Sequence, residues 1–179
     1  MKHIILVYFF LSMLSIHAQE KTKTGPILKN FGPVFQIENP DLLLDIDKVY
    51  RVIFDVYTDP SKDGKQNPLL TTVARYLNMH AQQGVPKENM KIVIVLHGAA
   101  TKSALNAESY QKQFNTENPN QELIAALKNV NVTLYVCGQS YLAQGFDLKD
   151  KSKNVKLALS ALTALVKFQS LGYQLITFN

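Results

Sequence analysis

The sequence predicts an α/β domain of three layers, in which helices cover both faces of a mainly parallel sheet of about five strands. From Val49 onward, apolar runs rich in β-branched residues alternate with segments whose apolar residues recur at helical spacing. The run Met90–Leu96 is almost continuously apolar, as expected of a strand buried on both faces. Repeated strand–helix units of this kind require parallel strands with helices packed on the sheet.

Five segments have the composition of strands. Each is short, mostly apolar or alternating, and bounded by polar residues or glycine. They are residues 49–57, 90–96, 132–136, 155–159 and 173–178.

Five helices are expected between these strands. Asn67 and Pro68 open the first, because asparagine caps a helix and proline fits its first turn, and Gly84 ends it. The same signal, Asn118 followed by Pro119, opens a later helix that continues through residue 130. The other helices are expected near residues 102–113, at 139–144 and at 160–172.

The amino-terminal segment, residues 1–18, has the layout of a secretory signal peptide. Lys2 precedes an apolar run at residues 4–14, and Ala18 is the small residue before the expected cleavage point. The run is short for a membrane span, so we expect an exported protein, periplasmic or secreted, without stable membrane insertion after cleavage; the alternative is an uncleaved anchor. Residues 19–47 form a tail and an extension, in which residues 34–37 are either a short strand or irregular. The domain is expected at residues 48–179.

Composition and motifs exclude several functions. The formal net charge of +5 becomes +4 without Lys2, but the lysines are spread along the chain and resemble no nucleic-acid-binding module. No glycine-rich nucleotide motif occurs, so no cofactor is expected. Beyond the signal segment, His80, His97 and one cysteine are too few for a zinc site. The calcium-loop pattern that begins at Asp59 has Leu70 where a glutamate is needed, so no metal is expected. His80 lies on the apolar face of its helix and is expected in or beside the core.

Cys137 is the only cysteine in the sequence, and it lies between a predicted strand and a predicted helix. A single cysteine cannot form an internal disulfide. The positive end of a helix favours a thiolate, which suits the position to sulfur chemistry. Free cysteines are also among the most buried residues, so the thiol is either reactive or inert and buried.

Three strand ends place polar residues at the carboxyl edge of the predicted sheet, where parallel sheets bind ligands. Asp55 lies near the end of the first strand, His97 and Gly98 follow the second, and Cys137 and Gly138 lie at the end of the third. A thiol and an imidazole at one edge can form a pair in which the histidine accepts the thiol proton. Otherwise, His97 lines the pocket or bonds nearby backbone, and Asp55 either pairs with another side chain or lines the pocket.

Four segments resemble the DsrE/DsrF-like family, in particular its exported members. The segments are residues 97–100 (HGAA), 118–123 (NPNQEL), 134–140 (LYVCGQS) and 160–173. The likeness covers residues 48–179 and implies a Rossmann-like αβα domain that assembles into trimers or hexamers. It also implies a sulfur relay in which a cysteine at the end of the third strand carries sulfur as a persulfide. Cys137 occupies that position, with Gly138 and Gln139 in its pocket.

Two features depart from the relay members of that family. Gln144 and Gly145 replace an arginine often found one turn after the cysteine, and export separates the chain from cytosolic relay partners. The expected function is a persulfide carrier or sulfurtransferase that exchanges sulfur with a donor or acceptor protein. The alternatives are a module that binds a small ligand or a protein, with Cys137 as a structural residue, and a purely oligomeric structural protein.

Overall fold

The computed structural model describes residues 22–62 and 64–178, so the expected signal peptide at residues 1–18 lies outside the described residues. A five-stranded parallel sheet forms the middle layer, in the order β4-β3-β2-β1-β5. The strands are β1 (Tyr50–Val56), β2 (Met90–Leu96), β3 (Thr133–Cys137), β4 (Lys156–Ala158) and β5 (Gln174–Thr177). All five predicted strands are confirmed, and the edge strands β4 and β5 are shorter than expected.

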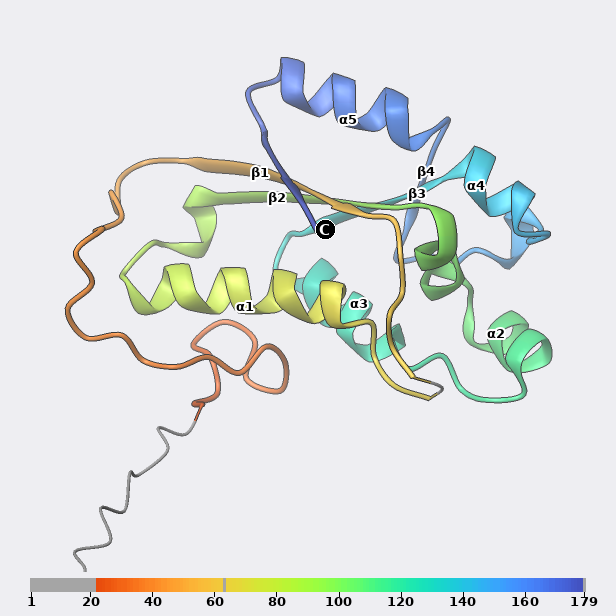
Figure 1. The fold of residues 1–179 in the computed structure, drawn as a ribbon, viewed down its shortest axis with the longest axis horizontal. Helices are drawn as coiled ribbons and strands as arrows, with labels where there is room; N and C mark the ends of the chain where they lie inside the picture. The colour runs from red at the N-terminus through yellow and green to blue at the C-terminus, as the bar shows by residue number, and fades with distance from the viewer. Residues whose placement is uncertain (1–21, 63, 179) are drawn as a thin grey trace, which may run out of the picture.

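Helices cover both faces of the sheet, which confirms the three layers. α1 (Pro68–Gln82) and α3 (Gln121–Asn129) pack on one face, and α5 (Ala161–Ser170) covers the other (Figure 1). α2 (Ala107–Phe114) and α4 (Gly138–Ala143) lie toward the carboxyl ends of the strands (Figure 1). None of the helices in the described ranges is long and apolar enough to cross a membrane.

Two helix boundaries differ from the prediction. The helix expected near residues 102–113 is a 3-10 helix, Gly98–Ala104, followed by α2, because the side chain of Asn106 accepts the Ser109 N–H at 2.8 Å and starts a new helix there. α3 begins at Gln121 rather than beside Pro119.

The extension before β1 packs on α1 through one buried asparagine. The side chain of Asn78 accepts the N–H groups of Ile27 and Leu28 at 3.3 and 3.0 Å. Its amide donates to the carbonyls of Leu28, Phe31 and Gly32 at 3.2, 2.9 and 2.9 Å. This side chain therefore satisfies two N–H groups and three carbonyls of a short irregular loop.

Two further expectations concern the surroundings of α1. Residues 35–37 are irregular, and Val34 forms an isolated antiparallel bridge with Lys23, so the short strand considered at 34–37 does not form. His80 is half-buried at the edge of the core, as expected, with its ring centroid 3.8 Å from that of Tyr76. Burial lowers the pKa of His80, and a hydrogen bond to the Tyr76 carbonyl opposes that shift.

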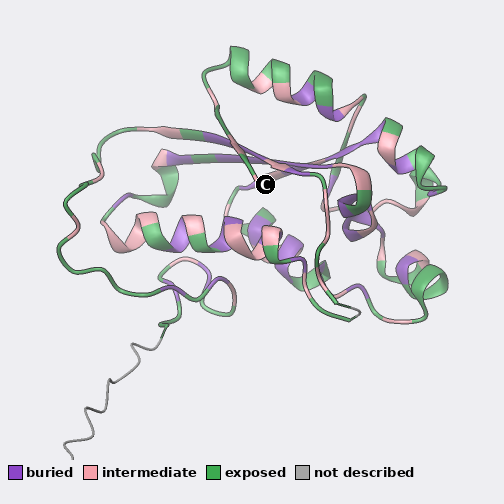
Figure 2. Ribbon diagram, in the orientation of Figure 1, coloured by how far each residue is buried: buried purple, intermediate pink, exposed green. Residues whose placement is uncertain are grey.

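The two faces of the sheet have cores of different extent. The face under α1 and α3 carries a large cluster of buried residues, including Phe54, Ile94 and Val136. In the ribbon coloured by burial, α5 on the other face is mostly exposed (Figure 2). The cluster on the other face is smaller. It consists of Ile53, Val93, Val95, Cys137, Ala161 and Ala164. Cys137 therefore belongs to the smaller core, which α5 covers.

Candidate functional site

The sheet brings the three predicted polar positions to one edge and one face. Leu96 of β2 pairs with Val136 of β3, so His97 and Cys137 each lie one residue beyond a paired position on neighbouring strands. Val95 and Cys137 both belong to the core under α5, and strand residues alternate between faces, so His97 lies on that same face. The same alternation, counted from Ile53, places Asp55 there as well.

Cys137 ends β3 and caps α4. Its sulfur accepts the backbone N–H of Ser140 at 3.3 Å, and the residue is 3% exposed. Burial raises the pKa of the thiol, but the side chain of Ser140 and the backbone N–H groups of Ser140, Ala161 and Gln139 lower it by hydrogen bonding, and the net shift is downward. These N–H groups come from the first turns of two helices, α4 and α5. The thiol is thus both buried and stabilised as a thiolate.

The glycine after the cysteine allows β4 to approach closely. A Cβ atom at Gly138 would lie 3.1 Å from the carbonyl oxygen of Ala158, which pairs with Cys137. Gln139 is exposed, and its N–H group is the part that acts on the sulfur. Gly138 therefore lies against β4, and Gln139 contributes to the surroundings of the sulfur through its backbone.

Asp55 and His97 form a direct pair. His97 Nε2 lies 2.7 Å from Asp55 Oδ1, and the two side chains are 26% and 16% exposed. Gly98 follows with φ +52°, which turns the backbone sharply away from β2. Within the described part of the chain, the structure records no hydrogen bond between His97 and Cys137. The sequence left the partner of Asp55 open, and the structure identifies it as His97.

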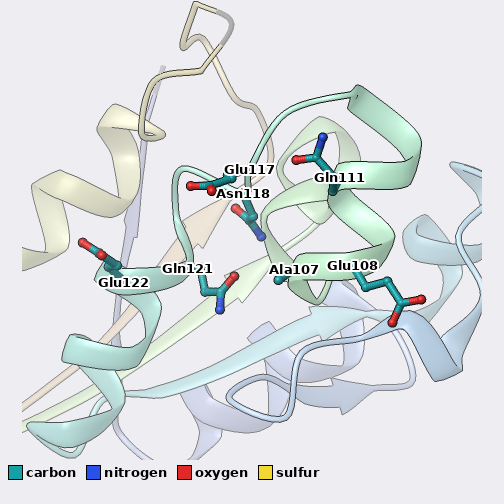
Figure 3. Close-up of a pocket in the computed structure, with 7 residues that line it drawn as sticks. All are labelled: Ala107, Glu108, Gln111, Glu117, Asn118, Gln121 and Glu122. Atoms are coloured by element: carbon teal, nitrogen blue, oxygen red, sulfur yellow. The ribbon is translucent and has the colours of Figure 1, made fainter.

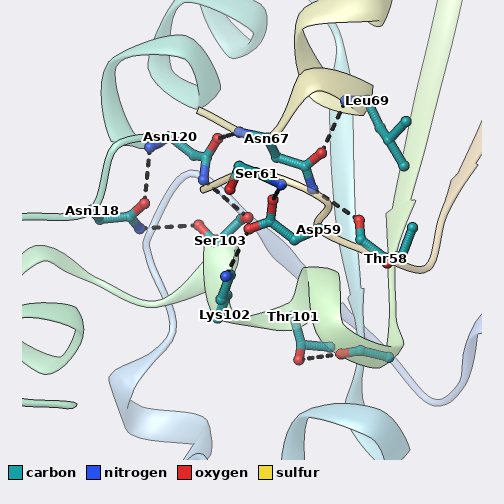
Figure 4. A network of polar contacts seen from close by, with 11 residues as sticks. Thr58, Asp59, Ser61, Asn67, Leu69, Thr101, Lys102, Ser103, Asn118 and Asn120 are labelled. Carbon is teal, nitrogen blue, oxygen red and sulfur yellow. Dashed lines mark hydrogen bonds and ion pairs between the residues drawn. The ribbon is translucent and has the colours of Figure 1, made fainter. Parts of the chain in front are cut away.

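An asparagine network fixes the loops at this edge of the sheet (Figure 4). Asn67 donates its N–H to Asn120 Oδ1 at 2.7 Å and its side-chain amide to the carbonyl of Thr58 at 3.0 Å. Asn120 Nδ2 donates to Ser103 Oγ at 3.2 Å, and Asn118 Nδ2 donates to the Ser103 carbonyl at 3.1 Å. The network joins the loop after β1, the 3-10 helix after β2 and the starts of α1 and α3. Sequence reasoning missed it, although the repeated Asn-Pro pair was its signal.

One cleft lies away from Cys137. A cleft of about 480 Å³ lies between α2 and the start of α3 (Figure 3). It is lined by Ala107, Glu108, Gln111, Glu117, Asn118, Gln121 and Glu122. None of these residues belongs to the Cys137 site. No group of three or more histidine, cysteine or acidic side chains in the described ranges is arranged to hold a metal ion.

Comparison with known proteins agrees with this fold. The chain is similar over 72% of its length to MTH1491 from Methanobacterium thermoautotrophicum, a protein of unknown function, at 20% identity, 99% coverage of that chain and a TM-score of 0.54. It is similar over the same share to the ychN protein from E. coli, at 17% identity, 99% coverage of that chain and a TM-score of 0.52. Likeness at these identities shows the fold. No curated protein matches the chain.

The sequence itself matches a defined family over most of the domain. Residues 51–178, from β1 to just beyond β5, match the DsrE/DsrF-like family. The matched range contains Cys137 with the strand and helix on either side of it. The chain belongs to the DsrE/DsrF-like family.

Proposed function

We propose that this protein carries sulfur as a persulfide on Cys137. The observation that carries the proposal is the set of N–H groups from α4 and α5 that lowers the pKa of a thiol at the carboxyl edge of the sheet. A lowered pKa increases the fraction of thiolate at neutral pH, and the thiolate is the form that attacks sulfur. Membership of the DsrE/DsrF-like family supports the same function.

Sulfur uptake from a polysulfide needs no added oxidant, because the sulfur that is transferred is already at the sulfane oxidation level. The Cys137 thiolate attacks a sulfane sulfur of the polysulfide, and a new S–S bond forms between them. The S–S bond of the donor breaks, and the shortened polysulfide leaves with the electron pair. A thiolate on an acceptor protein then takes the outer sulfur by the same exchange. The protein acts here as a carrier or sulfurtransferase between a donor and an acceptor.

The burial of Cys137 favours a second candidate function. At 3% exposure in an apolar cluster, the thiol also suits a structural role in a module that binds a ligand or protein elsewhere. The carrier function requires the junction between β4 and α5 to move, because Ala158 pairs with Cys137 and the Ala161 N–H bonds the sulfur. β4 is a three-residue edge strand, so few backbone hydrogen bonds oppose such a movement.

Intact-mass analysis after exposure to polysulfide tests the proposal. The native protein should gain about 32 Da, the mass of one sulfur atom on the thiolate. The rate should rise with pH through the thiol pKa, with a midpoint below the value of about 8.5 for free cysteine. Cys137→Ser should fold and gain nothing, because the hydroxyl is close to the thiol in size. A native protein that gains no sulfur, and whose thiol is alkylated only after unfolding, supports the structural cysteine instead.

We also propose a homo-oligomer, a trimer or hexamer, assembled through the outer face of α5. Leu162 and Val166 on this face are 77% and 68% exposed, and Leu159 before the helix is 71% exposed. Apolar residues grouped in this way commonly mark protein interfaces. Light scattering at micromolar concentration should give a multiple of the chain mass.

A matched pair of variants tests the surface. Leu162→Gln with Val166→Gln should shift the protein toward the monomer, whereas Leu42→Gln, at an 83% exposed site on the extension, should not. A wild-type protein that is monomeric at this concentration contradicts the proposal.

The last part of the proposed function concerns where the protein acts. Residues 1–18 have the layout of a cleavable signal, so we propose that the mature protein acts in the periplasm or outside the cell. Intact-mass analysis of protein purified from its own host also tests this cleavage, because the measured mass should be that of the chain without residues 1–18.

A further inference from the structure

The geometry of the Asp55–His97 pair determines which ring nitrogen of the histidine carries the proton. His97 Nε2 lies 2.7 Å from Asp55 Oδ1, within hydrogen-bonding distance. An ionised carboxylate only accepts hydrogen bonds, so a neutral His97 carries its proton on Nε2. Its Nδ1 is then a lone-pair acceptor. The ring of the exposed Tyr57 lies beside the ring of His97, and the two ring centroids are 5.9 Å apart.

The pair lies next to the thiol in the sheet. β1, β2 and β3 are consecutive strands, and Asp55, His97 and Cys137 project from the face that α5 covers. His97 and Cys137 are the residues that directly follow the paired Leu96 and Val136. Neighbouring strands lie about 4.8 Å apart, and the structure records no direct hydrogen bond between His97 and Cys137, so proton transfer between the imidazole and the thiol would pass through one water molecule.

We propose that Asp55 is a positioning residue that holds His97 with Nδ1 free to accept the proton of the Cys137 thiol. The S–H bond breaks, an N–H bond forms at Nδ1, and the thiolate attacks the sulfane sulfur of the polysulfide. The polysulfide fragment that leaves takes the electron pair, and the imidazolium returns the proton to it. This inference rests on the proposed sulfur-carrier function and adds the proton acceptor and the group that orients it.

Asp55→Asn tests the positioning role with little change in shape. The asparagine amide donates a hydrogen bond, so it favours a lone pair on Nε2 and moves the proton to Nδ1. Nitrogen NMR of the labelled imidazole should therefore report the Nε2–H tautomer in the wild type and the Nδ1–H tautomer in Asp55→Asn. The same tautomer in both proteins overturns the inference, whether or not Cys137 takes up sulfur.

The pH profile of sulfur uptake separates this inference from the proposed function. Near neutral pH, Asp55→Asn should take up sulfur at least about tenfold more slowly, because general-base assistance contributes about 100-fold or more. The rate should approach that of the wild type above the thiol pKa, where no base is needed. Asp147→Asn, which alters an exposed carboxylate paired with Lys149, should keep the wild-type profile.

His97→Gln gives a second variant should Asp55→Asn fail to fold. It should show the same slow uptake at neutral pH and the same recovery at high pH. If the wild type takes up sulfur and both variants keep its pH profile, the positioning role is overturned and the carrier function stands. If the wild type takes up no sulfur, the carrier function fails, and the tautomer measurement alone decides the Asp55–His97 arrangement.

Discussion

Gly98→Ala should lower the free energy of unfolding by about 3 kcal/mol or more, since two costs combine at this position. Gly98 has φ +52°, where a residue with a Cβ atom is strained. The added Cβ would also lie 2.5 Å from the carbonyl oxygen of Tyr57, which belongs to the loop after β1. Urea unfolding followed by circular dichroism measures the effect. Gly98 comes directly after His97, so the displacement should also alter the His97 ring signals in NMR.

Gly145→Ala is the matched control for the clash. Gly145 has φ +79°, but a Cβ atom there would meet no atom within 4 Å. Gly145→Ala therefore introduces the backbone strain without the clash, which predicts a loss of about 1 kcal/mol in the free energy of unfolding. Equal losses at Gly98 and Gly145 would mean that the approach of the Tyr57 carbonyl does not restrict the turn after β2.

Asn78→Ala should destabilise the protein by about 3 kcal/mol, because it leaves several buried backbone groups of the extension without partners. The Asn78 side chain is fully buried and bonds two N–H groups and three carbonyls of residues 27–32. Water replaces these bonds only if the loop leaves α1. Limited proteolysis should therefore cut the extension faster in this variant, in addition to the loss seen in denaturant unfolding.

Asn89→Ala is the comparison variant for the extension. The side chain of Asn89 makes one hydrogen bond, at the surface, to the carbonyl of Ile46 at 3.0 Å. Its loss should cost less than about 1 kcal/mol, because water replaces an exposed bond. If Asn78→Ala were no more sensitive to denaturant and protease than Asn89→Ala, the extension would not depend on the buried asparagine.

The strands and one helix start could be predicted because their signals are local. Met90–Leu96 reads as a buried strand from its own composition, and Asn67 caps α1 with a bond to the Leu69 N–H two residues away. Asn118 makes the same local bond, accepting the Asn120 N–H at 3.0 Å, yet α3 begins only at Gln121. An Asn-Pro pair therefore predicts the local bond but not the first residue of the helix.

The candidate site was predictable only in part for the same reason. Cys137 at the start of a helix follows from the residues around it, and so does the hydrogen bond from the Ser140 N–H. The contribution of Ala161 depends on how α5 crosses the sheet, which no local pattern specifies. The pairing of Asp55 with His97 spans 42 residues and requires that β1 and β2 be neighbours in register.

The late position of α5 and β5 in the chain has a consequence for the order of folding. β1 to β4 can pair in the order β4-β3-β2-β1 without the residues that follow β4. The outer edge of β1 stays open until β5 pairs with it, and the face that carries Cys137 stays uncovered until α5 packs on it. A folding intermediate without a docked α5 would therefore expose the Cys137 thiol while the core under α1 and α3 is already closed.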